Sequence, residues 1–164
     1  TAFIREAQLE CLELIPNSGI VITLDIGDQK TIHPPKKKEV ADRLLYNALN
    51  QTYGFNAVDY ASPRYDSHEI KDGGIVLSFK NAEAGLYCFD RLEGFEISGN
   101  DKIFYPAEAK IVDKNKVIVK SEKVTEPKAV RYAWRNWVNG TLYATSLLPV
   151  SSFRTYVDDP VTGE

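Results

Sequence analysis

The spacing of apolar residues changes near residue 56, from a helical period to the period of two that is typical of strands. Before this point, segment 5–14 mixes leucines with charged residues and predicts an amphipathic helix. Segment 37–53 repeats apolar residues at i, i+1, i+4 and i+5, which marks one face of a second helix. Pro34 and Pro35 suit the start of that helix, and Gly54 suits its end.

Between these helices, segment 20–26 is almost entirely apolar. A strand with one face in water would alternate with polar residues, so this pattern predicts a strand buried on both faces, as in a parallel sheet. A single strand cannot form such a sheet. We therefore expect residues 1–56 to need partner strands from outside this chain.

After residue 56, short alternating segments are separated by turns rich in Gly, Asn and Asp, which is typical of an antiparallel β-sandwich. The polar tail 158–164 is expected to fray. The predicted class is α+β: an incomplete piece of an α/β sheet over 1–56, then a β-sandwich domain over 57–164. The expected strands are 62–69, 74–79, 86–89, 93–98, 102–111, 116–119, 129–134 and 141–143.

Composition excludes several classes of function. The 164 residues are 43% apolar and 26% charged, as in an ordinary globular protein, and the net charge of −3 predicts no nucleic-acid partner. No apolar run approaches the roughly 18 residues of a membrane span. Cys11 and Cys88 fall in different parts of the predicted fold, so two buried free thiols are expected rather than a disulfide.

His33 is the main candidate for chemistry. It follows the polar loop 27–31 that leaves the expected strand, and it stands just before a helix. In open α/β sheets this edge gathers catalytic side chains, and histidine titrates near neutral pH, as a general base must. The other histidine, His68, falls in an expected strand, where an exposed side chain is favoured over a metal ligand.

Several segments together resemble the C-terminal part of sialate O-acetylesterases, which are carbohydrate esterases of the SGNH hydrolase superfamily. The resemblance covers essentially the whole chain, in order. It rests on segments 4–8, 25–28, 32–34 with the Lys-rich helix that follows, 94–99, 104–109, 129–134 and 148–155.

The resemblance implies an enzyme that removes O-acetyl groups from sialic acid or related sugars by Ser–His–Asp chemistry, with no cofactor or metal. His33 matches the catalytic histidine. Superfamily members often place the orienting aspartate three residues earlier, where this chain has Lys30. Asp28 is the nearest carboxylate and Asp25 the second candidate, and a backbone carbonyl is a third possibility.

The resemblance places the nucleophilic serine in the N-terminal half of the esterase. No Gly-x-Ser-x-Gly or Gly-x-Ser-Asn pattern occurs in this chain. We therefore expect this chain to supply the histidine, to be inactive alone, and to act with the N-terminal half. The resemblance is compatible with a secreted, periplasmic or lysosomal location.

The alternative function is a carbohydrate-binding or structural β-sandwich without catalysis. Aromatic residues 132, 134, 137 and 143 would stack on sugars or fill the core, and the core is favoured for one of Trp134 and Trp137. Arg131 and Arg154 would suit a sialic acid carboxylate, but ordinary surface arginines are favoured. Bracing the esterase core or a dimer interface is preferred over glycan binding as the task of the sandwich.

Overall fold

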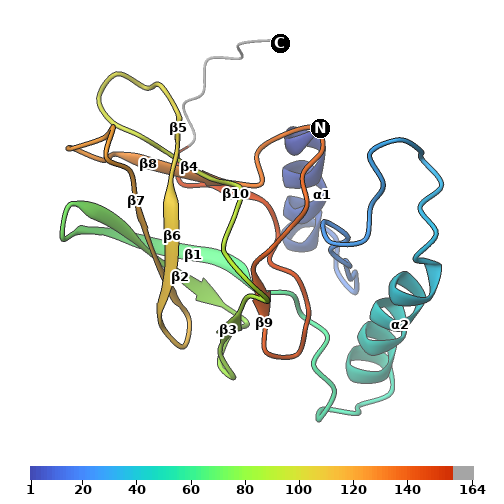
Figure 1. The fold of residues 1–164 in the computed structure, drawn as a ribbon. Coiled ribbons are helices and arrows are strands. Elements are labelled where there is room, and N and C mark those ends of the chain that lie inside the picture. Colours follow the sequence, from blue (N-terminus) through green and yellow to red (C-terminus); the bar gives the residue numbers. More distant parts are fainter. Residues whose placement is uncertain (157–164) are drawn as a thin grey trace.

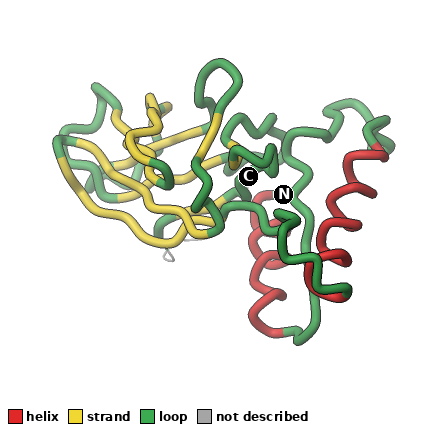
Figure 2. Tube along the Cα trace, turned by 90° about the horizontal axis from the view of Figure 1, so that it is seen from below, coloured by secondary structure: helices red, strands yellow, loops and turns green. Residues whose placement is uncertain are grey.

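The computed structural model describes residues 1–156 and combines helices with antiparallel sheets, which confirms the α+β class. Both helices lie on one side of the strands (Figures 1 and 2). The helices are α1 (Ala2–Leu14) and α2 (Lys37–Asn47), the latter continued by a π-helical turn η1 (Ala48–Thr52). The strands are β1 (Arg64–Lys71), β2 (Gly74–Lys80), β3 (Leu86–Tyr87), β4 (Phe95–Ser98), β5 (Tyr105–Pro106), β6 (Glu108–Asp113), β7 (Lys116–Lys120), β8 (Ala129–Tyr132), β9 (Tyr143–Ala144) and β10 (Phe153–Arg154).

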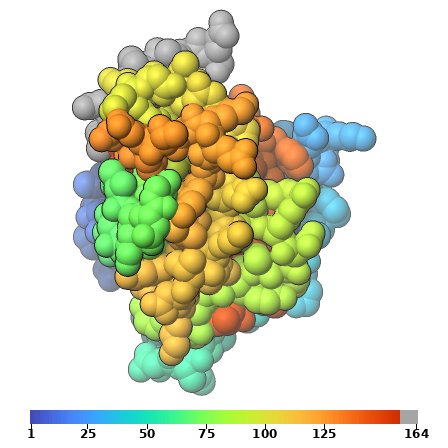
Figure 3. Space-filling view, turned by 60° about the vertical axis from the view of Figure 1, so that its left-hand side comes forward, coloured from blue at the N-terminus to red at the C-terminus, as the bar shows by residue number. Residues whose placement is uncertain are grey.

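The strands form two four-stranded antiparallel sheets, β1-β2-β7-β6 and β10-β8-β4-β5, and a small β3-β9 ladder. Figure 3 shows the first sheet from outside, with β6 and β7 in yellow to orange across the middle. Inward side chains of both sheets join one core, in which Leu77, Val119, Ile97 and Val130 are fully buried. Burial of this core is the main stabilising term for the β region (residues 57–156).

The strands expected after residue 56 overlap the observed ones, with one split and one addition. Expected strand 102–111 divides into β5 and β6, because the chain crosses between sheets at Ala107: β5 pairs with β4, whereas β6 pairs with β7. The Ala107 N–H donates to the Phe95 carbonyl at this crossing. Strand β10 was not expected, since two residues are too few to show alternation. The expected fraying of tail 158–164 lies outside the described residues.

The expected strand over 20–26 is not formed. Residues 20–23 have no regular structure, and residues 24–26 form a turn. A strand exists only through hydrogen bonds to a neighbour, and within residues 1–156 none of the N–H groups of residues 20–24 has a backbone partner. Nor is the segment buried on both faces: Thr23 is exposed and its neighbours are half-buried.

Helix α2 also differs from expectation, because its apolar stripe is not covered. Leu44 and Leu45 remain 53% and 51% exposed, whereas Arg43 is 7% exposed. The helix therefore turns a polar side chain toward the rest of the described chain and its leucines toward solvent. Amphipathic helices in folded domains normally do the reverse.

Helix α1 packs on the β region across the expected domain boundary. The Arg5 guanidinium donates to the carbonyls of Ala133 (2.7 Å) and Arg135 (2.8 Å) and to Ser152 Oγ (3.2 Å). Glu6 accepts two hydrogen bonds from Arg154, at 2.9 and 3.0 Å. These contacts bind α1 to the β region, while the boundary at residue 56 stays a prediction.

Candidate functional site

His33 lies in the irregular connection between residue 26 and α2 (Figure 1). Its side chain is exposed, and its backbone N–H donates to Thr31 Oγ1 at 3.1 Å. Within the described residues the imidazole itself forms no hydrogen bond. The ring is therefore accessible to a reacting group that approaches from solvent.

Asp28 shares this loop with His33, and the structure does not bring the two side chains into contact. Asp28 Oδ1 accepts a hydrogen bond from the Lys30 N–H at 2.7 Å, which closes a local turn. The carboxylate is exposed. Its second oxygen, Oδ2, has no hydrogen-bond partner among residues 1–156, so Asp28 retains an acceptor for an imidazole N–H.

Asp25, the second candidate, is already paired with Arg43. Arg43 Nη2 donates to Asp25 Oδ2 at 2.6 Å, and Nη1 donates to Oδ1 at 2.9 Å. Nη1 also donates to the Ile22 carbonyl at 2.6 Å. The two side chains are only 9% and 11% exposed, so this is a bidentate pair largely shielded from water. Asp25 is therefore a poor candidate for orienting His33.

The Asp25–Arg43 ion pair connects the two segments that flank the His33 loop. Asp25 precedes the loop that carries His33, and Arg43 lies on α2, which follows the loop. The pair therefore ties together the two ends of this loop. Sequence reasoning missed Arg43, because a charged residue outside the apolar stripe of α2 is expected to face solvent, whereas Arg43 is 7% exposed.

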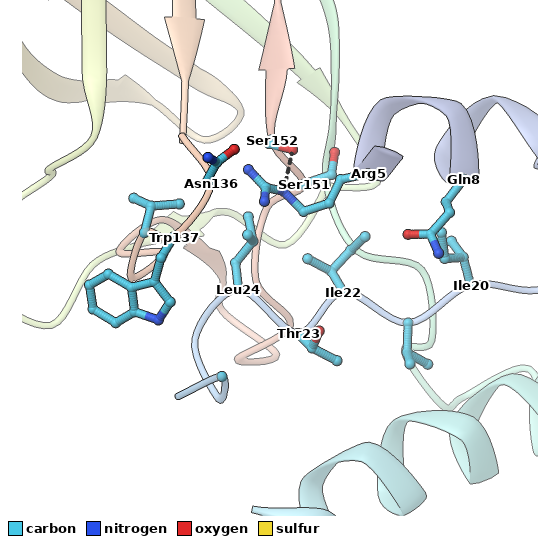
Figure 4. A pocket seen from close by; sticks show the side chains of 13 residues that line it. Arg5, Gln8, Ile20, Ile22, Thr23, Leu24, Asn136, Trp137, Ser151 and Ser152 are labelled. Carbon is cyan, nitrogen blue, oxygen red and sulfur yellow. Dashed lines mark hydrogen bonds between the residues drawn. The ribbon is translucent and has the colours of Figure 1, made fainter. Parts of the chain in front are cut away.

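Residues 20–24 run between the two helices, with α1 above and α2 below in Figure 4. Ile22 and Leu24 face Arg5 and Gln8 across a cavity of about 200 Å³ that the β region closes at Trp137 and Ser152. The buried Ser151 hydroxyl in its wall has no hydrogen-bond partner among the described residues. A single extended segment with a helix on each side is the layering of an α/β sheet.

The remaining polar candidates have ordinary roles. His68 is exposed on β1, as expected, and Nδ1 lies 2.7 Å from the Tyr65 hydroxyl. No group of three or more His, Cys, Asp or Glu side chains within residues 1–156 is arranged to hold a metal ion. Cys11 and Cys88 are free thiols, as predicted, but the expectation that both are buried was wrong: Cys11 is exposed and Cys88 is half-buried.

The aromatic and arginine candidates are mostly committed to the fold. Trp134 is 7% exposed and its ring meets Phe3 edge-on, which confirms the core role for one tryptophan; Trp137 is 46% exposed. Arg131 donates to Glu96, and Arg154 pairs with Glu6. Protein carboxylates thus occupy both arginines considered for a sugar carboxylate.

Tyr143, also among the aromatic candidates, is 9% exposed, and burial raises its pKa to about 12. Its hydroxyl donates to the Gly140 carbonyl at 3.0 Å. In the part of the chain that the structure describes, no helix is long and apolar enough to cross a membrane.

Comparison with solved structures gives an informative likeness. No protein-family model and no curated protein matches the chain. The crystal structure of a novel carbohydrate acetylesterase from Xanthomonas citri matches with a TM-score of 0.87 and 36% sequence identity. The match covers 96% of this chain but 36% of the acetylesterase chain. In sequence and in fold, this chain is therefore similar to about one third of a carbohydrate acetylesterase.

Proposed function

We propose that this chain is part of a carbohydrate esterase that removes acetyl groups from O-acetylated sugars. The observation that carries the proposal is the 36% identity to a carbohydrate acetylesterase over 96% of this chain. The sequence resemblance to sialate O-acetylesterases points to the same chemistry. By that resemblance, sialic acid or a related sugar carries the acetyl group.

In the proposed reaction, a serine hydroxyl attacks the acetyl carbonyl while His33 accepts the hydroxyl proton. The resulting imidazolium gives this proton to the sugar oxygen as its bond to the acetyl carbon breaks. Water then attacks the acetyl-serine, with His33 again as the base, and acetate and free serine are released. The exposed ring of His33 is accessible for this task.

Asp28 is the carboxylate that we propose to orient His33. Asp25 is held by Arg43 through two hydrogen bonds and is largely shielded from water, so recruiting it would break a buried ion pair. Asp28 is exposed and bound only to a backbone N–H of its own loop. If the loop rearranges so that Oδ2 accepts the imidazole N–H, Asp28 would fix the tautomer of the ring.

We propose that the serine comes from the N-terminal half of the esterase, which packs beside residues 20–24 and over α2. Two features support this proposal. The N–H groups of residues 20–24 lack backbone partners within residues 1–156, although the segment lies between two helices as a sheet strand would. Leu44 and Leu45 are about half exposed on α2. A neighbouring strand would accept hydrogen bonds from these N–H groups, and the layer packed on it would cover the two leucines.

The test is acetate release from an O-acetylated sialoside and from acetylated neutral oligosaccharides. We expect no catalysis by this chain alone, and hydrolysis when it is expressed with the N-terminal half. His33→Ala should lower kcat about 10³-fold or more, while His68→Ala, the matched control, should leave it unchanged. Hydrolysis by the isolated chain, or full activity of the His33→Ala enzyme, would contradict the proposal.

A further inference from the structure

We propose that an aromatic pocket beside the β3–β9 ladder binds a neutral oligosaccharide chain. The proposal extends the proposed function and rests on it for the carbohydrate nature of the ligand. The pocket, here called the Phe89 pocket, has a volume of about 230 Å³ and lies outside the loop that carries His33. The lining residues that matter are Phe89, Asp90, Arg91, Glu93, Asn139 and Tyr143.

The pocket is lined by an exposed aromatic ring that its neighbours hold in place. Phe89 is 67% exposed, yet its ring is held edge-on by Tyr87 at 5.1 Å and by Tyr143 at 5.4 Å between centroids. Tyr143 is in turn fixed by burial and by its bond to the Gly140 carbonyl. A ring held in place before binding loses little conformational entropy when a ligand stacks on it. The C–H face of a pyranose is a suitable partner for such a ring.

The rim of the pocket supplies planar polar groups. Among residues 1–156, the Asp90 carboxylate and the Asn139 amide form no hydrogen bonds, and both residues are exposed. Arg91 and Glu93 pair with each other at 2.6 Å and remain exposed. Carboxylate, amide and guanidinium groups can each bind two neighbouring hydroxyls of a sugar. An apolar ring with such a rim fits a sugar better than a purely apolar ligand.

The charge of the pocket selects among sugars. Asp90 and Glu93 carry two negative charges against one positive charge on Arg91, so an anionic sugar would be repelled. The volume lies below the roughly 300–1,000 Å³ of pockets that enclose a whole ligand. The geometry thus fits one neutral ring at a time within a longer chain. Pyranoses with equatorial hydroxyls suit it, because they present an apolar C–H face to the phenyl ring.

One residue that lines the pocket, Gly140, contacts the segment that leads to the His33 loop. The Gly140 N–H donates to the Leu24 carbonyl at 3.1 Å, next to Asp25 of the Asp25–Arg43 pair. A glycan held in the Phe89 pocket would therefore be anchored to a segment that contacts the chain next to the Asp25–Arg43 pair. The pocket would retain the polymer while other residues of the chain are deacetylated.

Calorimetric titration of the 164-residue chain with cellohexaose tests the proposal, since this β-glucan oligosaccharide carries no charge and no acetyl group. We expect saturable binding that weakens roughly tenfold in Phe89→Ala and also in Asp90→Ala, and that Phe89→Tyr retains. Trp137→Ala, which removes an exposed aromatic side chain outside the pocket, should bind as the unaltered chain does. Melting temperatures verify that each variant is folded.

Three results would overturn the proposal: no heat of binding at millimolar cellohexaose, loss of binding in Trp137→Ala but not in Phe89→Ala, or equal affinity for the anionic trisaccharide sialyllactose. Because cellohexaose has no ester, the outcome does not depend on catalysis. Binding without any hydrolysis in the completed esterase would retain the pocket and reject the enzymatic proposal. Hydrolysis by the completed esterase without binding of cellohexaose would retain the enzymatic proposal and reject the pocket.

Discussion

Replacing Arg43 by Met should strongly destabilise the helical part of the chain. The substitution keeps most of the side-chain volume but removes the guanidinium, which leaves Asp25 largely shielded from water without its bidentate partner and the Ile22 carbonyl without its donor. Both charged side chains are about one-tenth exposed, so little solvent screening reduces the effect. Removing one partner of a buried pair typically costs ~3–5 kcal/mol.

That cost would be a large part of the ~5–15 kcal/mol by which whole domains are stable. Urea unfolding followed by circular dichroism at 222 nm measures the loss as a lower midpoint at unchanged slope. If α2 melts separately from the β region, the same loss appears as an earlier first transition. Hydrogen exchange of the α2 amides would then report it directly.

The double variant Asp25→Leu with Arg43→Met tests whether the loss comes from leaving the Asp25 carboxylate buried without its partner. Replacing a whole buried pair by apolar residues is often neutral, so this variant should regain most of the stability lost in the single variant. Lys38→Ala is the surface control on the same helix: its pair with Asp42 is exposed and should contribute nothing measurable. A single-variant loss below ~1 kcal/mol would refute the view that the pair fixes the two ends of the His33 loop.

Three further predictions follow from the structure. Leu44→Glu with Leu45→Glu should leave the isolated chain folded, as circular dichroism would show, yet abolish esterase activity with the N-terminal half; retained activity would argue against a partner on this face. Glu6→Ala should destabilise the chain by ~1–3 kcal/mol in thermal melts because Arg154 loses two hydrogen bonds, whereas Glu10→Ala on the same helix should not; equal effects would reject the packing of α1. Since burial raises the folded-state pKa of Tyr143 from 10.0 to about 12, the folded state holds its proton more tightly, and this contribution to stability should be lost as pH rises from 10 to 12; ultraviolet titration showing every tyrosine ionised near pH 10 in the folded chain would contradict it.

The β region was largely predictable because its core residues alternate locally. The apolar positions of β2 and β7 point into one core, and the turn residues between strands are evident in the sequence. The split of segment 102–111 was not predictable, since a crossing between two sheets at Ala107 depends on which strands each half meets.

The helical part was predictable as a pattern but not as a packed structure. Segment 20–26 has the composition of a central strand, yet strand formation requires a neighbour that residues 1–156 do not supply. For the same reason, the stripe with Leu44 and Leu45 predicts burial that this chain alone does not provide.

The candidate site was predictable only in part. His33 and Asp28 followed from the motif and the loop, and their roles remain predictions. The pairing of Asp25 with Arg43 spans 18 residues, and the exposure of Phe89 depends on the packing of Tyr87 and Tyr143. Such contacts are decided by tertiary structure and leave no periodic signal.

Labelling with a fluorophosphonate, which reacts with activated serine hydroxyls, tests the central claim most directly. We predict that the N-terminal half is labelled at one serine only when this chain is present, and that His33→Ala in this chain abolishes labelling while His68→Ala preserves it. Labelling of the N-terminal half that is equally strong without this chain, or with the His33→Ala variant, would contradict the account.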